Sequence, residues 1–156
     1  KLFEIYTEQI TALAEAGADL LVVETMLGID EMTVALEAAQ SVCALPVLCS
    51  MTVQADGSGY FGGTCVEAVE TLQELGAAAV GINCSTGPDQ LESLVRNMRQ
   101  AAKVPLLVKP NAGMPEISPE FAQHMRTLID AGAALVGGCC GTDPRYISAL
   151  RDVLPR

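Results

Sequence analysis

The chain has 156 residues, a length that suits one domain with a single buried core. Half of the residues are hydrophobic but only 4% are aromatic and none is Trp, so the core must be mainly aliphatic. With 19 acidic against 9 basic residues the formal net charge is −10, which disfavours nucleic acid or an anionic membrane surface as a partner because phosphates repel it.

No run of about 18 apolar residues predicts a transmembrane helix, and the first residues, KLFEIYTEQ, lack the basic-then-apolar pattern of a signal peptide. The chain also lacks an initiator Met and begins inside an apparent helix, so we expect it to be part of something longer. Secreted disulfide scaffolds are usually shorter than this chain and richer in cysteine than its six. We therefore predict a reducing, cytoplasmic location, where clustered cysteines more often bind metal or do chemistry.

A helix followed by a short apolar run recurs along the chain. Helices are predicted at about residues 4–16, 31–43, 66–75, 88–102 and 121–131. Strands are predicted to follow them at residues 20–23, 46–53, 79–82, 105–108 and 135–136. Gly17, Gly76 and Gly132 are stop signals after three of the helices, and Pro46 and Pro105 open the other two strands. A last helix is expected after Thr142-Asp143-Pro144, with Thr142 or Asp143 as its N-cap.

Continuous apolar strands that alternate with helices predict a parallel sheet, either covered on both faces or closed into a barrel. The position of polar residues favours the barrel, because they follow nearly every strand: Glu24-Thr25, Ser50 to Thr52, Asn83-Cys84-Ser85, Lys109 to Asn111 and Cys139-Cys140. Barrel enzymes build their sites from the C-terminal ends of many strands, whereas open sheets concentrate theirs at one switch point. We predict an α/β fold of the parallel (β/α)8 TIM-barrel type, present over residues 1–156 as a single incomplete domain, because five strands cannot close a barrel of eight.

The glycine-rich segment Asp56–Gly63 follows a predicted strand, which places it among the loops at the site end of the sheet. It lacks the GxGxxG spacing or the Walker lysine of a phosphate-binding loop. An active-site or interaction loop is the better interpretation.

The paired cysteines in Gly137-Gly138-Cys139-Cys140-Gly141 carry the most information about chemistry. Adjacent cysteines rarely bridge each other, but both can ligate one metal if the backbone turns, and the flanking glycines allow such a turn. Cys84, just past another strand, offers a third thiolate. Three thiolates leave one tetrahedral position for an exchangeable ligand, as expected of catalytic zinc. The alternative is that these are small residues packed near the barrel rim, as we expect for Cys43, Cys49 and Cys65.

The chain resembles the homocysteine S-methyltransferase family, whose motifs occur in order over nearly its whole length: LVVETM at 21–26, GINC at 81–84, PNAG at 110–113 and VGGCCGT at 136–142. The resemblance implies a zinc ion held by Cys84, Cys139 and Cys140, with the homocysteine sulfur in the remaining position as a thiolate that attacks an activated methyl group to give methionine. It implies that Glu24 helps to hold the amino acid part of homocysteine and that Asn111 lies near the metal or ligates it when substrate is absent.

The family domain is a full barrel, so the resemblance implies that this chain carries about strands four to eight, with a shortened loop at Met114–Pro119. The methyl donor could be methylcobalamin charged from methyltetrahydrofolate through other domains, S-methylmethionine or a betaine. The open sheet edge needs cover from missing residues, other domains or a second copy in a homo-oligomer.

Two other functions stay open. One is a non-catalytic zinc-binding fragment or assembly module that lacks a complete substrate pocket. The other is a β/α-barrel lyase or isomerase with incidental cysteines. Lys109, at a strand end, is interpreted either as a contact for an anionic group or as a solvated rim residue, and His124 as a surface or packing residue.

Overall fold

The structure is a computed structural model that describes residues 1–113 and 118–154. The part described contains one sheet of five strands: β1 (Leu21–Met26), β2 (Val47–Met51), β3 (Ala79–Cys84), β4 (Leu106–Pro110) and β5 (Ala133–Val136). The helices are α1 (Leu2–Glu15), α2 (Ile29–Val42), α3 (Cys65–Glu74), the 3₁₀ helix η1 (Pro88–Gln90), α4 (Glu92–Ala101), α5 (Ser118–Ala131) and α6 (Pro144–Val153). Each predicted helix and strand is therefore present.

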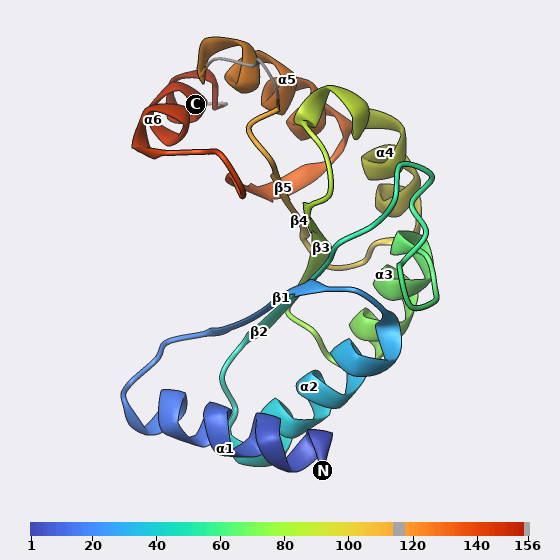
Figure 1. Ribbon diagram of the computed structural model, residues 1–156, viewed down its shortest axis with the longest axis vertical. Helices are drawn as coiled ribbons and strands as arrows, with labels where there is room; N and C mark the ends of the chain where they lie inside the picture. The colour runs from blue at the N-terminus through green and yellow to red at the C-terminus, as the bar shows by residue number, and fades with distance from the viewer. Residues whose placement is uncertain (114–117, 155–156) are drawn as a thin grey trace.

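The strands pair in sequential order, from β1 at one edge to β5 at the other, and every pair is parallel. A doubly wound sheet would instead reverse its strand order partway. The helices follow one another along an arc on one side of the strands, and the two termini lie at the ends of that arc (Figure 1). The prediction of a parallel, barrel-type sheet of five strands is confirmed.

The two faces of the sheet differ in cover, because successive residues of a strand point to opposite sides. One face packs on the helices in a single, mainly aliphatic core, to which every strand contributes, for example Cys49, Ile82 and Val108. The opposite face is partly open: Val22 and Leu135, on the two edge strands, are 45% and 37% exposed. The polar residues that end the strands lie together at the C-terminal end of the sheet, where the site is built.

The boundaries differ from the predictions in a few places. Strand β1 runs on through Glu24 and Thr25 to Met26, because its first three residues and Met26 all pair with β2 around an irregularity. The helix expected at 88–102 is divided into η1 and α4 at Leu91. Asp143 rather than Thr142 caps α6, since its side chain accepts from the backbone N–H of Arg145. Met114–Ile117, the greater part of the shortened loop, lies outside the described residues.

In the described part of the chain, every helix is too short or too polar to cross a lipid bilayer.

Candidate metal centre

Three cysteine thiols from distant parts of the chain meet at the C-terminal edge of the sheet. The Sγ atoms of Cys84, Cys139 and Cys140 all lie within 4.8 Å of one another, and those of Cys84 and Cys140 are 3.7 Å apart. Within residues 1–113 and 118–154 no other group of three His, Cys, Asp or Glu side chains is close enough to share a metal ion. The structure thus brings together the three residues that the sequence singled out.

The backbone at the end of β3 is turned so that Cys84 can join the cluster. In a regular strand Cys84 would face away from the side chain of Asn83. Instead Cys84 and Ser85 have φ values of 61° and 63°, in the left-handed region that non-glycine residues rarely adopt. The Ser85 hydroxyl accepts a hydrogen bond of 2.9 Å from the backbone N–H of Val53, which supports the turn. Such strain concentrates at functional sites, where the surrounding structure maintains it.

The loop after β5 carries the cysteine pair and is closed by short backbone contacts. The N–H of Cys139 donates to the carbonyl oxygen of Pro110 at 2.8 Å, and its own carbonyl oxygen accepts from the hydroxyl of Thr142 at 2.7 Å. A Cβ atom at Gly138 would lie 2.5 Å from the Thr142 side chain, and Gly141 has a φ of 81°. Glycine is therefore needed on both sides of the pair, as the sequence suggested.

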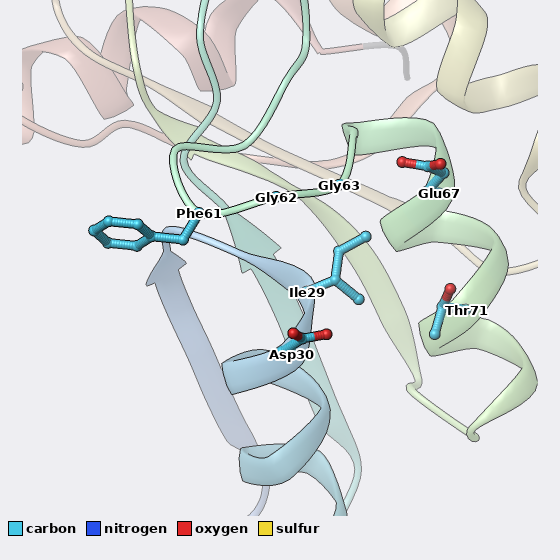
Figure 2. Close-up of a pocket in the computed structure, with 7 residues that line it drawn as sticks. All are labelled: Ile29, Asp30, Phe61, Gly62, Gly63, Glu67 and Thr71. Atoms are coloured by element: carbon cyan, nitrogen blue, oxygen red, sulfur yellow. The ribbon is translucent and has the colours of Figure 1, made fainter.

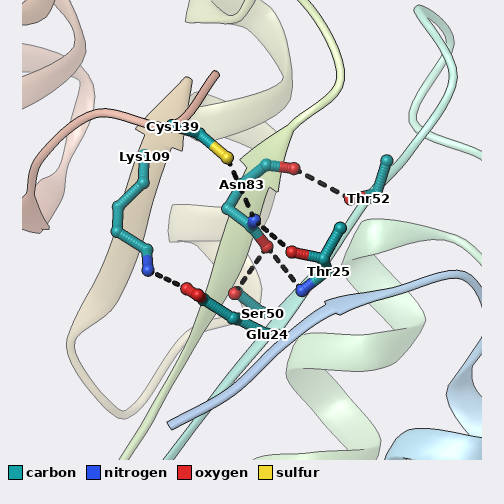
Figure 3. Close-up of polar contacts among 7 residues, drawn as sticks. All are labelled: Glu24, Thr25, Ser50, Thr52, Asn83, Lys109 and Cys139. Carbon is teal, nitrogen blue, oxygen red and sulfur yellow. Dashed lines mark hydrogen bonds and ion pairs between the residues drawn. The ribbon is translucent and has the colours of Figure 1, made fainter. Parts of the chain in front are cut away.

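Asn83 is a site residue that the sequence analysis mentioned only as part of a motif. Its side-chain oxygen accepts from the backbone N–H of Thr25 at 2.9 Å and from the hydroxyl of Ser50 at 2.7 Å. Its amide nitrogen donates to the Thr25 hydroxyl at 2.8 Å and to the Sγ atom of Cys139 at 3.7 Å (Figure 3). A polar amide in an otherwise apolar strand was the signal that could have identified it.

Cys84 and Cys139 differ in how readily their thiols ionise. Burial raises the pKa of Cys84, and hydrogen bonds with the neighbouring thiols raise it further. Burial acts in the same direction on Cys139, but hydrogen bonds from Asn83 and from the backbone N–H of Cys140 outweigh it, so the pKa of Cys139 lies below its usual value. Cys139 therefore loses its proton before Cys84.

One pair of thiols in the cluster already has the spacing expected in a tetrahedral zinc site. A zinc–sulfur distance of about 2.3 Å places two thiolates on one ion about 3.8 Å apart, close to the 3.7 Å between the Sγ atoms of Cys84 and Cys140. Thiolates are soft ligands that select zinc over magnesium or calcium. Three of them leave one tetrahedral position for another ligand.

The two predicted substrate residues, Asn111 and Glu24, have different partners in the structure. The side-chain oxygen of Asn111 accepts from the backbone N–H of Cys140 at 3.2 Å, so Asn111 adjoins the cluster. Glu24, on β1, forms an ion pair with Lys109, on β4 (Figure 3). The Glu24 and Lys109 side chains are 47% and 24% exposed, so both remain accessible from the open face. The anionic group that Lys109 contacts is therefore Glu24 itself, a pairing that the sequence analysis missed.

A separate hollow of about 360 Å³ lies between the starts of α2 and α3 and the glycine-rich loop (Figure 2). Its lining residues are Ile29, Asp30, Phe61, Gly62, Gly63, Glu67 and Thr71. The glycine-rich loop does follow β2, as predicted, but this hollow includes none of the predicted site residues.

Comparison with known proteins gives one family. The family model described as homocysteine S-methyltransferase matches residues 1–154. Methionine synthase of Mycobacterium leprae (strain TN) is 28% identical over 98% of this chain, and that of Mycobacterium tuberculosis (strain ATCC 25618 / H37Rv) is 29% identical over 92% of it. The chain spans only 14% and 13% of those relatives' lengths.

The solved structures that resemble this chain include members of the same family. The Escherichia coli homocysteine methyltransferase MmuM matches 97% of this chain in its apo form, with a TM-score of 0.82 and 27% identity, over 57% of that chain. The metallated form matches 96% with the same TM-score and 28% identity, over 51% of that chain. A 2,3-dimethylmalate lyase, with a TM-score of 0.73 but only 16% identity, shares the fold alone. Because the family model covers almost every residue, this chain belongs to the homocysteine S-methyltransferase family.

Proposed function

We propose that this chain is part of a zinc-dependent domain that transfers a methyl group to the thiolate of homocysteine and so forms methionine. The observation that carries the proposal is the convergence of Cys84, Cys139 and Cys140, within 4.8 Å of one another, in a chain of this family. Three thiols at the open end of strands suit a site that must admit a fourth ligand. The family supplies the substrate class, since the related MmuM is a homocysteine methyltransferase.

Zinc, when bound by these thiolates, supplies the positive charge that lets a substrate thiol lose its proton at neutral pH. The chain's own residues hold and orient the groups around it. The backbone contacts of the Cys139 loop fix the cysteine pair. The side-chain oxygen of Asn111 accepts a hydrogen bond from the backbone N–H of Cys140 and so holds Cys140 at the cluster.

Glu24 is proposed to bind the ammonium group of homocysteine. Its carboxylate already takes a cationic partner, the ammonium of Lys109, on the open face of the sheet. A substrate ammonium can replace a partly solvated lysine at such a position, because exposed ion pairs contribute little stability. Asn111, beside the cluster, is the second proposed substrate contact.

The methyl donor and the remaining partners are proposed to come from outside this chain. The curated relatives are about seven times as long, so methylcobalamin charged from methyltetrahydrofolate can be presented by other domains. The exposed apolar residues Val22 and Leu135 on the two edge strands support cover by further strands, other domains or a second copy. A cytoplasmic, reducing location accords with six free thiols among the described residues.

The proposal is tested by measuring metal and substrate in the same protein. Reduced protein should carry about one zinc per chain by elemental analysis, Cys139→Ser should lose it, and Cys49→Ala should keep it because Cys49 lies in the helix-facing core. Titration of the zinc-loaded chain with homocysteine in two buffers of different ionisation enthalpy should show release of a proton near neutral pH, whereas methionine, which has no thiol proton, should not.

The outcomes separate the proposed functions. Absence of zinc from reduced wild-type protein would overturn the proposal. Zinc binding without homocysteine binding would favour the second candidate, a non-catalytic zinc-binding fragment or assembly module. That candidate draws its support from the open edges of the sheet, where β1 and β5 each lack a neighbour on one side within the described residues.

The proposed role of Glu24 is tested separately. Glu24→Gln should weaken homocysteine binding without changing the zinc content.

A further inference from the structure

The amide of Asn83 has all of its hydrogen-bonding capacity in use. A side-chain amide offers two donors and two acceptor positions. Here the oxygen accepts from the Thr25 N–H and the Ser50 hydroxyl, and the nitrogen donates to the Thr25 hydroxyl and to the Sγ atom of Cys139. Asn83 is only 1% exposed, so water cannot replace these partners. The amide is a specific connection between β1, β2, β3 and the Cys139 loop.

The orientation of this amide is determined by its partners. The backbone N–H of Thr25 can only donate, so the atom that faces it at 2.9 Å must be the amide oxygen. The nitrogen then has to face Cys139, where it places an N–H donor against the sulfur. An aspartate in the same place would offer only acceptors and would set a negative charge against a thiolate.

Asn83 contacts Cys139 through its side chain and is also the sequence neighbour of a second cysteine of the cluster, Cys84. Asn83 directly precedes Cys84, whose φ of 61° departs from the strand conformation. Thr25, which the same amide holds through both its backbone N–H and its hydroxyl, has a φ of 63°. For a β-branched residue such a conformation is costly and persists only where neighbours maintain it.

We propose that Asn83 is a positioning residue of the metal centre, whose amide sets the Cys139 thiolate relative to Cys84 and offsets part of its negative charge. The inference rests on the proposed zinc site. Groups that hydrogen-bond to metal ligands fix their orientation, and their removal typically costs about 10–100-fold in metal affinity. Asn83 acts on the metal only through Cys139 and is not itself a ligand.

Ser50 provides the matched control. Its hydroxyl donates to the same amide at 2.7 Å and is fully buried, but no hydrogen bond joins it to a thiol of the cluster. Ser50→Ala thus removes one contact of Asn83 without removing the donor that faces the sulfur. Asn83→Asp is close in shape but removes both N–H donors. Asn83→Ser, small and neutral, removes the contact without adding charge.

The experiment titrates reduced, metal-free protein with Co²⁺, whose sulfur-to-metal charge-transfer absorbance reports the number of bound thiolates, and then displaces it with zinc. Circular dichroism of each variant before metal addition shows that the variant is folded. We expect N83D to bind Co²⁺ about 10–100-fold more weakly than wild type and to show at saturation an absorbance reduced toward that of two thiolates. S50A should match wild type in both measurements. N83S should also bind more weakly, and it replaces N83D if N83D is unfolded.

A folded N83D or N83S that matches S50A in both Co²⁺ affinity and absorbance would overturn the positioning role, because a purely structural contact would lower stability without moving the metal spectrum. That result would leave the metal centre intact. Wild-type protein that binds neither Co²⁺ nor zinc would overturn the proposed function together with this inference.

Discussion

Cysteines occupy two chemically different regions of this protein. Cys49 and Cys65 lie buried in the helix-facing core, where burial raises the pKa of both thiols, that of Cys49 to about 12. Cys139 and Cys140 lie in the loop after β5, the first half-buried and the second exposed. The thiol of Cys139 accepts hydrogen bonds from the Asn83 amide and from the backbone N–H of Cys140. The same side chain is an inert packing residue in one region and a ligand candidate in the other. Environment, not residue type, decides the chemistry.

The largest expected difference is in thiol reactivity. In reduced, metal-free protein, iodoacetamide should modify Cys139 and Cys140 at least about 100-fold faster than Cys49, because Cys49 reacts only after local unfolding. Rates are measured by quenching at intervals and quantifying modified peptides by mass spectrometry. Zinc should protect the strand-end cysteines and leave the rate at Cys49 unchanged. Equal rates at the two regions would contradict the comparison.

The next effect concerns stability. Phe121 is fully buried in the core and packs edge-on against Tyr146, with ring centroids 5.4 Å apart. Phe121→Ala should lower the free energy of unfolding of metal-free protein by about 3–5 kcal/mol. Urea denaturation measures this loss. Phe121→Leu, which keeps most of the volume, should lose less, and Cys139→Ser should change the free energy by less than about 1 kcal/mol because its side chain lies outside the core.

A smaller effect concerns pH. A cysteine in the unfolded chain ionises near its ordinary pKa of 9.0, whereas burial raises the pKa of Cys49 in the folded protein to about 12. Above about pH 9 the unfolded state therefore binds fewer protons than the folded state, and stability falls by about 1.4 kcal/mol per pH unit until the folded thiol also ionises. Urea midpoints at about pH 8.5, 9.5 and 10.5, which lie on either side of the unfolded pKa, test this. In Cys49→Ala the free energy of unfolding should fall less steeply with pH than in wild type. An identical slope in the two proteins would show that the Cys49 thiol is not the cause of the decline.

The smallest expected effect lies at the start of α3. The Thr64 hydroxyl accepts from the Glu67 N–H at 3.2 Å, and the Glu67 carboxylate accepts from the Thr64 N–H at 2.8 Å. Thr64→Ala removes half of this capping box and should cost about 1 kcal/mol. Urea denaturation detects the change. Thr64→Ser keeps the acceptor and should be close to wild type, and zinc content should be equal in all three proteins.

Much of the fold was predictable because its signals are local. A glycine or a proline after each helix, followed by an apolar run, located every strand in order, and polar residues at strand ends correctly favoured a barrel-type sheet. The cysteine pair stood out because glycines flank it. These features depend on backbone conformation within a few residues, which the neighbouring side chains largely determine.

Contacts between distant strands were not predictable in the same way. The ion pair of Glu24 with Lys109 joins residues 85 apart in sequence. Gly81 has no local feature that sets it apart in its strand, yet a Cβ there would lie 1.7 Å from the carbonyl oxygen of Leu107. The ion pair depends on how the sheet places β1 relative to β4, and the need for glycine depends on how closely β3 and β4 approach. Nothing local in these segments specifies either arrangement.

The sequence by itself determined the alternation of helices and strands, the family motifs and the residues able to bind a metal. Only the tertiary structure decided that Cys84 meets Cys139 and Cys140, since that meeting requires a left-handed turn after β3 and the register of strands far apart in the chain. The amide of Asn83 is the clearest case. The sequence specifies this asparagine at one position, but its four hydrogen bonds go to three residues, Thr25, Ser50 and Cys139, on segments that meet only when the sheet forms.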